Sequence, residues 1–294
     1  MALRLATRGS ALALTQAGQV AELLGGAALV EVSSDGEPGD KARFVRGVER
    51  ALLDDEAEIG VHSAKDLPAE MADGLTIAAV PAREDPADVW IGVGSSLDEV
   101  PEGARVGTAS LRRRAQLLAA RPDLRVSELH GNVDTRLRRL SEGELDAIVL
   151  AAAGLRRLGR EAEASFSIPA ELMTPAAGQG ALVLQARSGD EAATSVAAAL
   201  GDETALRELT AERAAVALLE ATCATPIGVH ARVEGQRLVA EAFVGLPDGS
   251  EWIRDRVEGE AAAPAALGAA LAERLLAAGA RQILDRAETW SAPA

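Results

Sequence analysis

The sequence contains very little of several residue types, and each shortage excludes a class of protein. A single cysteine in 294 residues excludes an internal disulfide bond. There is no tyrosine, and only three Phe and three Trp are present, which argues against binding nucleic acid by stacking bases on aromatic rings. The three histidines lie far apart in the chain without the spacing of metal ligands, so we expect no metal site.

Long apolar runs are missing as well. No stretch of eighteen apolar residues is present, and the first residues lack the apolar centre of a signal peptide. The formal net charge of −15 disfavours a polyanionic partner such as nucleic acid. We therefore expect a cytoplasmic, monomeric protein that binds neither nucleic acid nor membranes and acts on a small molecule.

Basic residues are distributed unevenly along the chain. Residues 87–174 contain 12 arginines against 13 Asp and Glu, a net charge of −1, whereas residues 1–86 and 175–294 each carry −7. Only two of the 30 basic residues are lysines, Lys41 and Lys65. An arginine-rich middle third in an acidic protein is typical of a region that holds a small polyanionic ligand.

The most informative stretch follows a short apolar run at 58–61, which predicts a buried strand. Lys65 and Asp66 come next, in a polar turn that Pro68 closes. In open α/β sheets, ligands bind at the carboxyl ends of the strands. An isolated Lys-Asp pair is more often an exposed surface ion pair, so the functional interpretation depends on the neighbouring motifs.

Two strand-turn-helix junctions predict anion sites. The first joins a strand at 3–7 to a helix at 11–24 through Arg8 and Ser10, and Ser10 is a suitable helix N-cap. The second joins a strand at 105–107 to a helix at 111–118 through Thr108 and Ser110. Free backbone N–H groups at helix N-termini bind carboxylates, although a plain capped helix with surface arginines is the alternative at each junction.

Arginines recur in the same positions later in the chain. Arg112 and Arg113 occupy the first turn of the predicted helix at 111–118, where positive charge opposes the helix macrodipole. Anion binding therefore explains their placement better than helix stability does. Arg136 follows a predicted strand at 124–129, and Arg157 follows another at 146–151. These arginines are expected to line a cleft opposite Lys65.

Alternation of strands and helices predicts an α/β fold with mostly parallel sheets. Two segments read as crossovers, which predicts two hinged α/β lobes arranged like those of periplasmic binding proteins. We expect residues 1–81 and 181–199 to form lobe 1 and residues 87–174 to form lobe 2. Residues 203–294 predict a small C-terminal α+β domain: a helix at 203–220, strands at 228–233, 238–244 and 252–257, and a closing helix at 264–278.

Six motifs occur in a fixed order along the chain, and together they resemble the porphobilinogen deaminase family. Any one of them alone would be weak support. The motifs are Ala6-Thr7-Arg8-Gly9-Ser10, His62-Ser63-Ala64-Lys65-Asp66-Leu67-Pro68, Val106-Gly107-Thr108-Ala109-Ser110-Leu111-Arg112-Arg113, Gly131-Asn132, Gly178-Gln179-Gly180, and Cys223 before Pro226-Ile227-Gly228.

The resemblance implies a transferase that joins four porphobilinogen molecules head to tail, with loss of ammonia at each step. The product is 1-hydroxymethylbilane for tetrapyrrole (haem-type) biosynthesis, built on a dipyrromethane cofactor that a cysteine holds as a thioether. By this resemblance Cys223 anchors the cofactor and Asp66 is the catalytic acid/base. Each pyrrole carries an acetate and a propionate, so the growing chain is a polyanion that arginines suit.

The same resemblance assigns the remaining site residues. The residues implied to bind the cofactor are Ser63, Lys65, Thr108, Ser110, Arg112, Arg113 and Arg136. The residues implied to bind substrate are Arg8, Ser10, Lys41, Phe44, Arg157 and Gln179.

The chain departs from the family pattern at three places. His130 replaces an arginine before Gly-Asn, Ala221 and Thr222 replace two glycines before the cysteine, and the loop at 35–43 is shortened. Two alternatives stay open on the residues alone. One is a non-catalytic, two-lobed protein that binds small anions, and the other is a degenerate paralogue of the deaminase without turnover.

Overall fold

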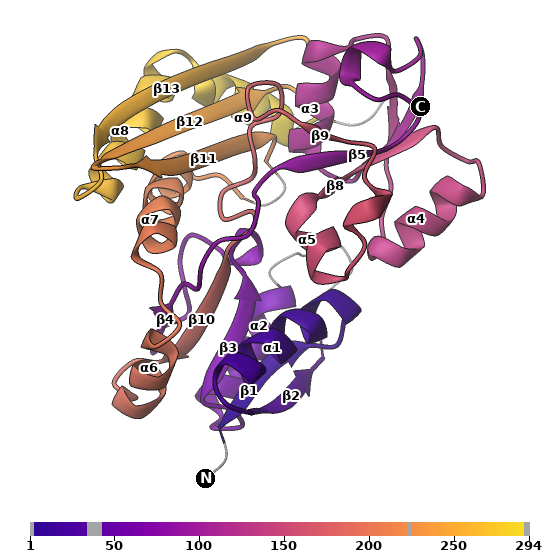
Figure 1. Ribbon diagram of the computed structural model, residues 1–294. Helices are drawn as coiled ribbons and strands as arrows, with labels where there is room; N and C mark the ends of the chain where they lie inside the picture. Colours follow the sequence, from indigo (N-terminus) through magenta and orange to yellow (C-terminus); the bar gives the residue numbers. More distant parts are fainter. Residues whose placement is uncertain (1–2, 34–42, 223–224, 291–294) are drawn as a thin grey trace.

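The computed structural model describes residues 3–33, 43–222 and 225–290. The described chain forms two α/β lobes and a third, smaller domain (Figure 1). In that view lobe 1 lies at the bottom with the N-terminus, lobe 2 at the upper right and the C-terminal domain at the upper left. The predicted fold class is therefore confirmed: two α/β lobes with a small C-terminal α+β domain.

Lobe 1 is built on a five-stranded sheet of order β2-β1-β3-β10-β4, in which only β10 runs antiparallel to its neighbours. The apolar side chains of Leu5, Ile59 and Leu184 are fully buried between this sheet and α1. The elements are β1 (Arg4–Arg8), α1 (Ala11–Leu23), β2 (Ala28–Val32), α2 (Arg43–Leu53), β3 (Ile59–Ser63), β4 (Leu75–Ala79), β10 (Leu182–Arg187) and α6 (Glu191–Ala198).

Lobe 2 repeats this design with the order β7-β6-β8-β5-β9, and here β5 is the antiparallel strand. Trp90, Ile148 and Leu117 are buried in its core. The elements are β5 (Asp88–Gly92), β6 (Arg105–Gly107), α3 (Leu111–Ala120), β7 (Arg125–Ser127), α4 (Val133–Ser141), β8 (Ala147–Ala151), α5 (Ala152–Arg157) and β9 (Phe166–Ile168).

Two crossovers, residues 80–87 and 169–181, connect the lobes and run side by side. Glu84 N donates to Gly180 O at 3.2 Å. Gly180 has φ +87°, and a Cβ there would lie 2.2 Å from Glu84 O, so only glycine fits. A Cβ on Gly178 would likewise lie 2.9 Å from Lys65 N. The Gly-Gln-Gly motif thus allows one crossover to pack closely against both the other crossover and the Lys65 turn.

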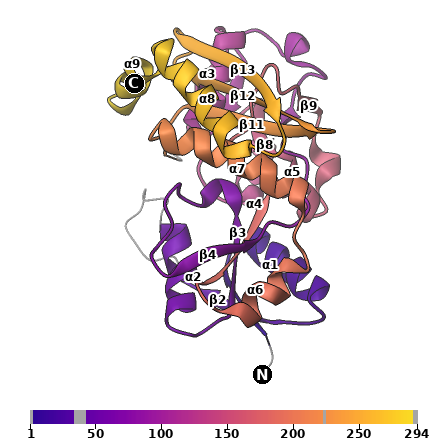
Figure 2. The ribbon, with the colours of Figure 1, turned by 90° about the vertical axis from the view of Figure 1, so that its left-hand side faces the viewer.

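The C-terminal domain packs three helices on one face of an antiparallel sheet of order β11-β12-β13. Figure 2 shows α8 lying across that sheet beside α7. Alternate residues along β12, such as Leu238 and Ala240, point into the core. The elements are α7 (Glu203–Leu218), β11 (Ile227–Glu234), β12 (Arg237–Gly245), β13 (Trp252–Glu260), α8 (Pro264–Ala277) and α9 (Ala280–Glu288).

The expectation that the helix at 264–278 closes the chain was wrong, because α9 follows it. Gly279 adopts φ +102° and ends α8, and the chain then starts a new helix. Apolar residues that are buried at helical spacing, Ala280, Ile283, Leu284 and Ala287, hold α9 in the domain core. That spacing was readable in the sequence.

Candidate active site

The Lys65-Asp66 pair lies where the apolar pattern predicted, directly after β3. Residues 64–66 form a single 3-10 turn, and Ala64 N donates to Ala181 O of the second crossover at 3.0 Å. Because β1 and β3 are parallel neighbours, the end of β1 brings Arg8 beside Asp66, with Nη1 3.5 Å from Oδ2. The Asp66 side chain is 35% exposed and can exchange protons with water.

The helix N-termini of both lobes are built alike. Ser10 caps α1 by accepting a hydrogen bond from Ala13 N, and Ser110 caps α3 by accepting one from Arg113 N. Thr108 is buried, and its Oγ1 accepts from Ser110 N at 3.2 Å. Each capped end leaves backbone N–H groups at the carboxyl end of a parallel strand, as the sequence predicted.

Arg112 and Arg113 are buried, and both pair with Asp88, the first residue of β5. Arg112 Nη1 lies 2.7 Å from Asp88 Oδ2, and Arg113 Nε lies 2.9 Å from Oδ1. Burial opposes ionisation of Asp88, but the two arginines hold its pKa well below the usual range. These arginines therefore have an internal structural partner in addition to any ligand, which the sequence analysis did not anticipate.

Sequence reasoning missed Asp88, although one signal was present. An acidic residue opens an otherwise apolar strand immediately after a crossover, and an isolated charge in that place requires a buried partner. The third partner of Asp88, after the two arginines, is Gln179. Its Nε2 donates to Asp88 Oδ1 at 3.1 Å and to Pro86 O at 2.6 Å. Gln179 is 1% exposed and ties the two crossovers to β5.

Cationic side chains from both lobes converge near Lys65. Burial, and after it the nearby Arg113, lower the pKa of Lys65 to about 8, against the opposing effects of Asp66 and Asp88. Burial, and then Arg113, also lower the pKa of Arg136 to about 10. Lowered pKa values of neighbouring cations indicate a positive electrostatic potential at the site. A bound anion would be stabilised there.

The other predicted binding residues lie around this cluster or in the crossovers. Arg136 on α4 donates through Nε to Gly131 O at 2.9 Å, and Arg157 at the end of α5 donates to Gly180 O at 2.7 Å. Ser63 is the last residue of β3 and is half-buried. Arg157 and Gln179 are thus placed at the connection between the lobes, and the remaining described residues line the ends of the strands.

Three of the predicted residues cannot be placed from this structure. Cys223 and Lys41 lie outside the described residues, and Phe44 lies in the first turn of α2, where only its backbone is described. The flanks of the cysteine are defined: Thr222 N donates to Thr225 Oγ1 at 2.8 Å. His130, which departs from the family pattern, is exposed on the surface, with Nε2 3.0 Å from Glu128 Oε2.

A buried carboxylate joins the crossovers to the C-terminal domain. Glu212 on α7 is fully buried and accepts hydrogen bonds from Arg83 Nη1 at 2.7 Å, from Gly178 N at 2.6 Å and from Ala231 N at 2.8 Å. Burial opposes its ionisation, but Arg83 lowers the pKa of Glu212 overall. Glu212 was also missed, although it lies at helical spacing from buried Ala205 on α7.

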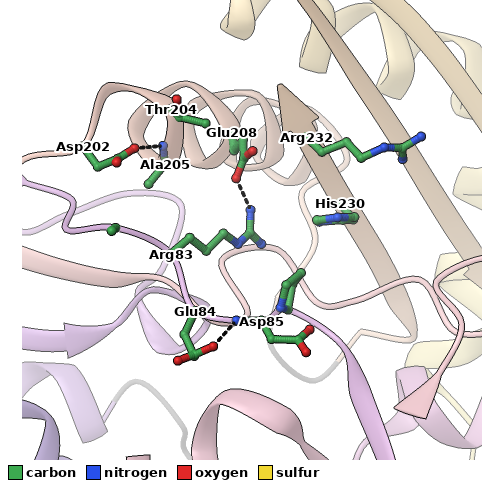
Figure 3. Close-up of a pocket in the computed structure, with 11 residues that line it drawn as sticks. Arg83, Glu84, Asp85, Asp202, Thr204, Ala205, Glu208, His230 and Arg232 are labelled. Atoms are coloured by element: carbon green, nitrogen blue, oxygen red, sulfur yellow. Dashed lines mark hydrogen bonds and ion pairs between the residues drawn. The ribbon is translucent and has the colours of Figure 1, made fainter. Parts of the chain in front are cut away.

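A hollow of about 540 Å³ lies beside this junction and is separate from the cationic cluster. Figure 3 shows Arg83 pointing from the first crossover toward Glu208 on α7, with His230 of β11 beyond it. Its charged side chains have partners within the protein, such as Glu208 for Arg83 and Arg156 for Glu84. Convergent cations at strand ends are a better criterion for an anion site than volume, so the cluster at Lys65 and Asp66 is the candidate active site.

Membrane-spanning helices and metal-binding clusters are both absent from the described ranges. Between residues 3 and 290, apart from the gaps at 34–42 and 223–224, no helix has the length and apolarity needed to cross a bilayer. Over the same ranges, no three His, Cys, Asp or Glu side chains are grouped so that they could hold a metal ion.

Comparisons with known proteins show which family the chain resembles. Residues 3–195 match the family model "Porphobilinogen deaminase, dipyromethane cofactor binding domain", and residues 206–277 match "Porphobilinogen deaminase, C-terminal domain". The chain is 43% identical to the porphobilinogen deaminase of Brevibacillus brevis over 96% of both chains. It is 47% identical to that of Thiobacillus denitrificans over 84% of this chain and 81% of the relative.

Among solved structures, a TRAP periplasmic solute binding protein from Desulfovibrio salexigens is 12% identical, with a TM-score of 0.41 over 70% of this chain and 73% of that chain. The two family models together cover both lobes and most of the C-terminal domain, and the relatives match along nearly the whole length. The motifs that define the site lie within these matches. The chain therefore belongs to the porphobilinogen deaminase family.

Proposed function

We propose that the protein is a transferase that deaminates porphobilinogen and joins four of these molecules head to tail, releasing 1-hydroxymethylbilane. The observation that carries this proposal is the cationic cluster around Lys65, which lies beside the half-exposed carboxylate of Asp66. The cluster suits the acetate and propionate of each pyrrole, and the carboxylate suits the aminomethyl group that leaves. Membership of the family favours this function over that of a non-catalytic anion-binding protein.

The residues present fit a dipyrromethane cofactor. Two linked pyrroles carry four carboxylates, and the described site offers Lys65, Arg113, Arg136 and the capped N-terminus of α3 at Ser110 as donors. Burial, and after it Arg113, lower the pKa values of both Lys65 and Arg136, so each cation would be stabilised by a bound carboxylate. When bound, the cofactor supplies the free pyrrole α-carbon on which the chain grows. We propose Cys223 as its thioether anchor.

Asp66 is the proposed acid/base. In each cycle the substrate's aminomethyl group reacts in its protonated form: the bond between the methylene carbon and the ammonium nitrogen breaks, and the nitrogen takes the electron pair and leaves as ammonia. The anionic Asp66 stabilises the resulting azafulvene cation and the pyrrole N–H groups. A new carbon-carbon bond then forms, and Asp66 assists loss of the α-proton, which its 35% exposure allows it to pass to water.

Further residues are proposed to bind the carboxylates of the substrate or to stabilise the connection between the lobes. We propose that Arg8, Ser10 and Arg157 contact substrate, together with Lys41 and Phe44, and that Arg112 and Gln179 act mainly by fixing the interlobe connection. Lobe 1 comprises residues 1–81 and 181–199, lobe 2 residues 87–174, and the cofactor-bearing domain residues 203–294. We propose that the protein acts as a monomer in the cytoplasm.

Replacement of Asp66 by alanine tests this function. We expect the parent to consume porphobilinogen, and the variant to lose at least about 100-fold in kcat, the usual contribution of a general acid/base, while still binding the substrate. A parent that binds porphobilinogen without consuming it would indicate the degenerate paralogue. A parent that binds other small dicarboxylates equally well, without reaction, would indicate the binding protein.

A further inference from the structure

Trp290, the last residue that the structure describes, contacts lobe 2. Trp290 follows α9, and its backbone N–H donates to Ala287 O at 3.2 Å. Its ring lies under the guanidinium of Arg114 on α3, with Cζ 4.9 Å from the ring centroid. Arg114 follows Arg112 and Arg113 directly, four residues after the N-cap Ser110. The far end of the chain thus touches the helix that carries the proposed carboxylate donors.

The contact with Trp290 stabilises the charged guanidinium of Arg114 more than it would stabilise that of an exposed arginine. Its Nη1 donates to Val126 O at 2.6 Å, but its buried Nε has no hydrogen-bond partner. Burial lowers the pKa of Arg114, and the acids that oppose this shift are Glu128 and Asp248. A cation that is partly removed from water gains from the face of an indole ring, so Trp290 stabilises the charged form in place.

Trp290 also closes the space beside the carboxylate-binding turn. The ring lines a hollow of about 10 Å³ together with Thr108, Ser110 and Glu128. A hollow of that size holds one water molecule at most. Hydrogen bonds from the hydroxyls and N–H groups of a turn are stronger where competing water is excluded. The indole therefore keeps one side of the turn nearly dry.

We propose that Trp290 is a positioning residue for the carboxylate-binding turn of residues 108–110. It covers one side of the turn, fixes Arg114, and thereby holds the N-terminus of α3 in the geometry that receives a carboxylate of the cofactor or growing chain. This inference rests on the proposed function. Because α9 is packed into the core of the C-terminal domain, the domain that supplies the proposed anchor cysteine also supplies this cover.

Three variants test the proposal. Trp290→Ala removes the cover, Trp290→Phe restores an aromatic face, and Trp252→Ala is the matched control. Trp252 lies in the same domain, is 50% exposed and stacks on Phe243 with ring centroids 6.0 Å apart, away from the turn. We expect Trp290→Ala to raise KM for porphobilinogen about tenfold and to leave kcat within about twofold. The expected weakening of carboxylate binding equals the free energy of one desolvated cation-π contact. Trp290→Phe should recover most of the loss, and Trp252→Ala should match the parent.

A second measurement does not depend on turnover. Hydrogen exchange of peptides that cover residues 108–114 should be faster in Trp290→Ala than in the parent and unchanged in Trp252→Ala. Unchanged exchange and KM in Trp290→Ala would overturn the proposal, as would equal effects of Trp252→Ala or a fall in kcat alone. If the parent itself fails to consume porphobilinogen, the proposed function fails, while the exchange data still decide whether Trp290 orders the turn.

Discussion

Oδ1 of Asp88 accepts a hydrogen bond from Nε of Arg113 at 2.9 Å in the buried interior of lobe 2. The same carboxylate binds Arg112 and the side-chain amide of Gln179 in the second crossover. The buried carboxylate of Asp88 thus links Arg113, a residue of the proposed site, to the second crossover between the lobes. The position of Arg113 relative to Lys65 therefore depends on Asp88, a fully buried residue.

Replacement of Asp88 by asparagine should be strongly destabilising. It leaves two buried guanidinium groups without their counter-charge, so we expect the free energy of unfolding to fall by about 3–5 kcal/mol. Asp146→Asn is the matched control, because Asp146 pairs with the exposed Arg105 and should cost less than about 1 kcal/mol. Urea unfolding of the variants measures both. Equal small losses would show that Asp88 is not the counter-charge of the arginine pair.

The pH dependence of substrate capture should report Lys65. Its pKa of about 8 lies below that of an exposed lysine, so its ammonium is lost as the pH rises through 8. We expect kcat/KM to fall above pH 8 in the parent, since kcat/KM reports ionisation of the free enzyme. In Lys65→Arg the cation persists, and the normalised profile should stay level to pH 9. An identical fall in both proteins would assign the titration to another group.

The same shift has a consequence for stability. Between pH 8 and the usual lysine pKa, the unfolded chain binds more protons at Lys65 than the folded chain does, so this group makes the folded state more stable as the pH rises through that window. Comparing the unfolding free energies of the parent and Lys65→Met at pH 7.5 and pH 10 measures this term. We expect the parent to gain relative to the variant on going to pH 10, and a relative loss would contradict the assigned direction.

Arg83 and Glu212 should be energetically coupled across the interface between the first crossover and the C-terminal domain. Their side chains lie 2.7 Å apart, and both are nearly inaccessible to water. We expect each single alanine variant to cost about 3–5 kcal/mol and the double variant to cost much less than the sum, with a coupling energy of up to about 3 kcal/mol. A double-mutant cycle in urea measures this. Additive losses would mean that Glu208 or His230 replaces the missing partner.

Gly180→Ala tests the close packing of the two crossovers. The variant meets both a left-handed φ and the Glu84 carbonyl oxygen, whereas Gly143→Ala meets only a similar φ of +77° with open space around it. We expect Gly143→Ala to lose about 1–2 kcal/mol and Gly180→Ala to lose more by about 1–3 kcal/mol, the added cost of forcing atoms into a packed position. Thermal unfolding gives the difference. Equal losses would show that the crossovers separate readily.

Much of the fold was predictable because local patterns determine it. The apolar run before Lys65 and the serine N-caps at Ser10 and Ser110 specify strand ends and helix starts, and the structure has them there. The partners of Asp88 and Glu212 were not predictable, since each pair joins residues far apart in sequence whose meeting depends on the crossovers. The contact between Arg114 and Trp290 was missed for the same reason.

The central claim is tested most directly by the intact mass of the purified protein, with a Cys223→Ala variant beside it. We expect the parent to exceed its sequence mass by two linked pyrrole units and the variant to match its sequence mass. This result would establish both the dipyrromethane and its anchor. A parent at its bare sequence mass, both as purified and after incubation with porphobilinogen, would contradict the deaminase account.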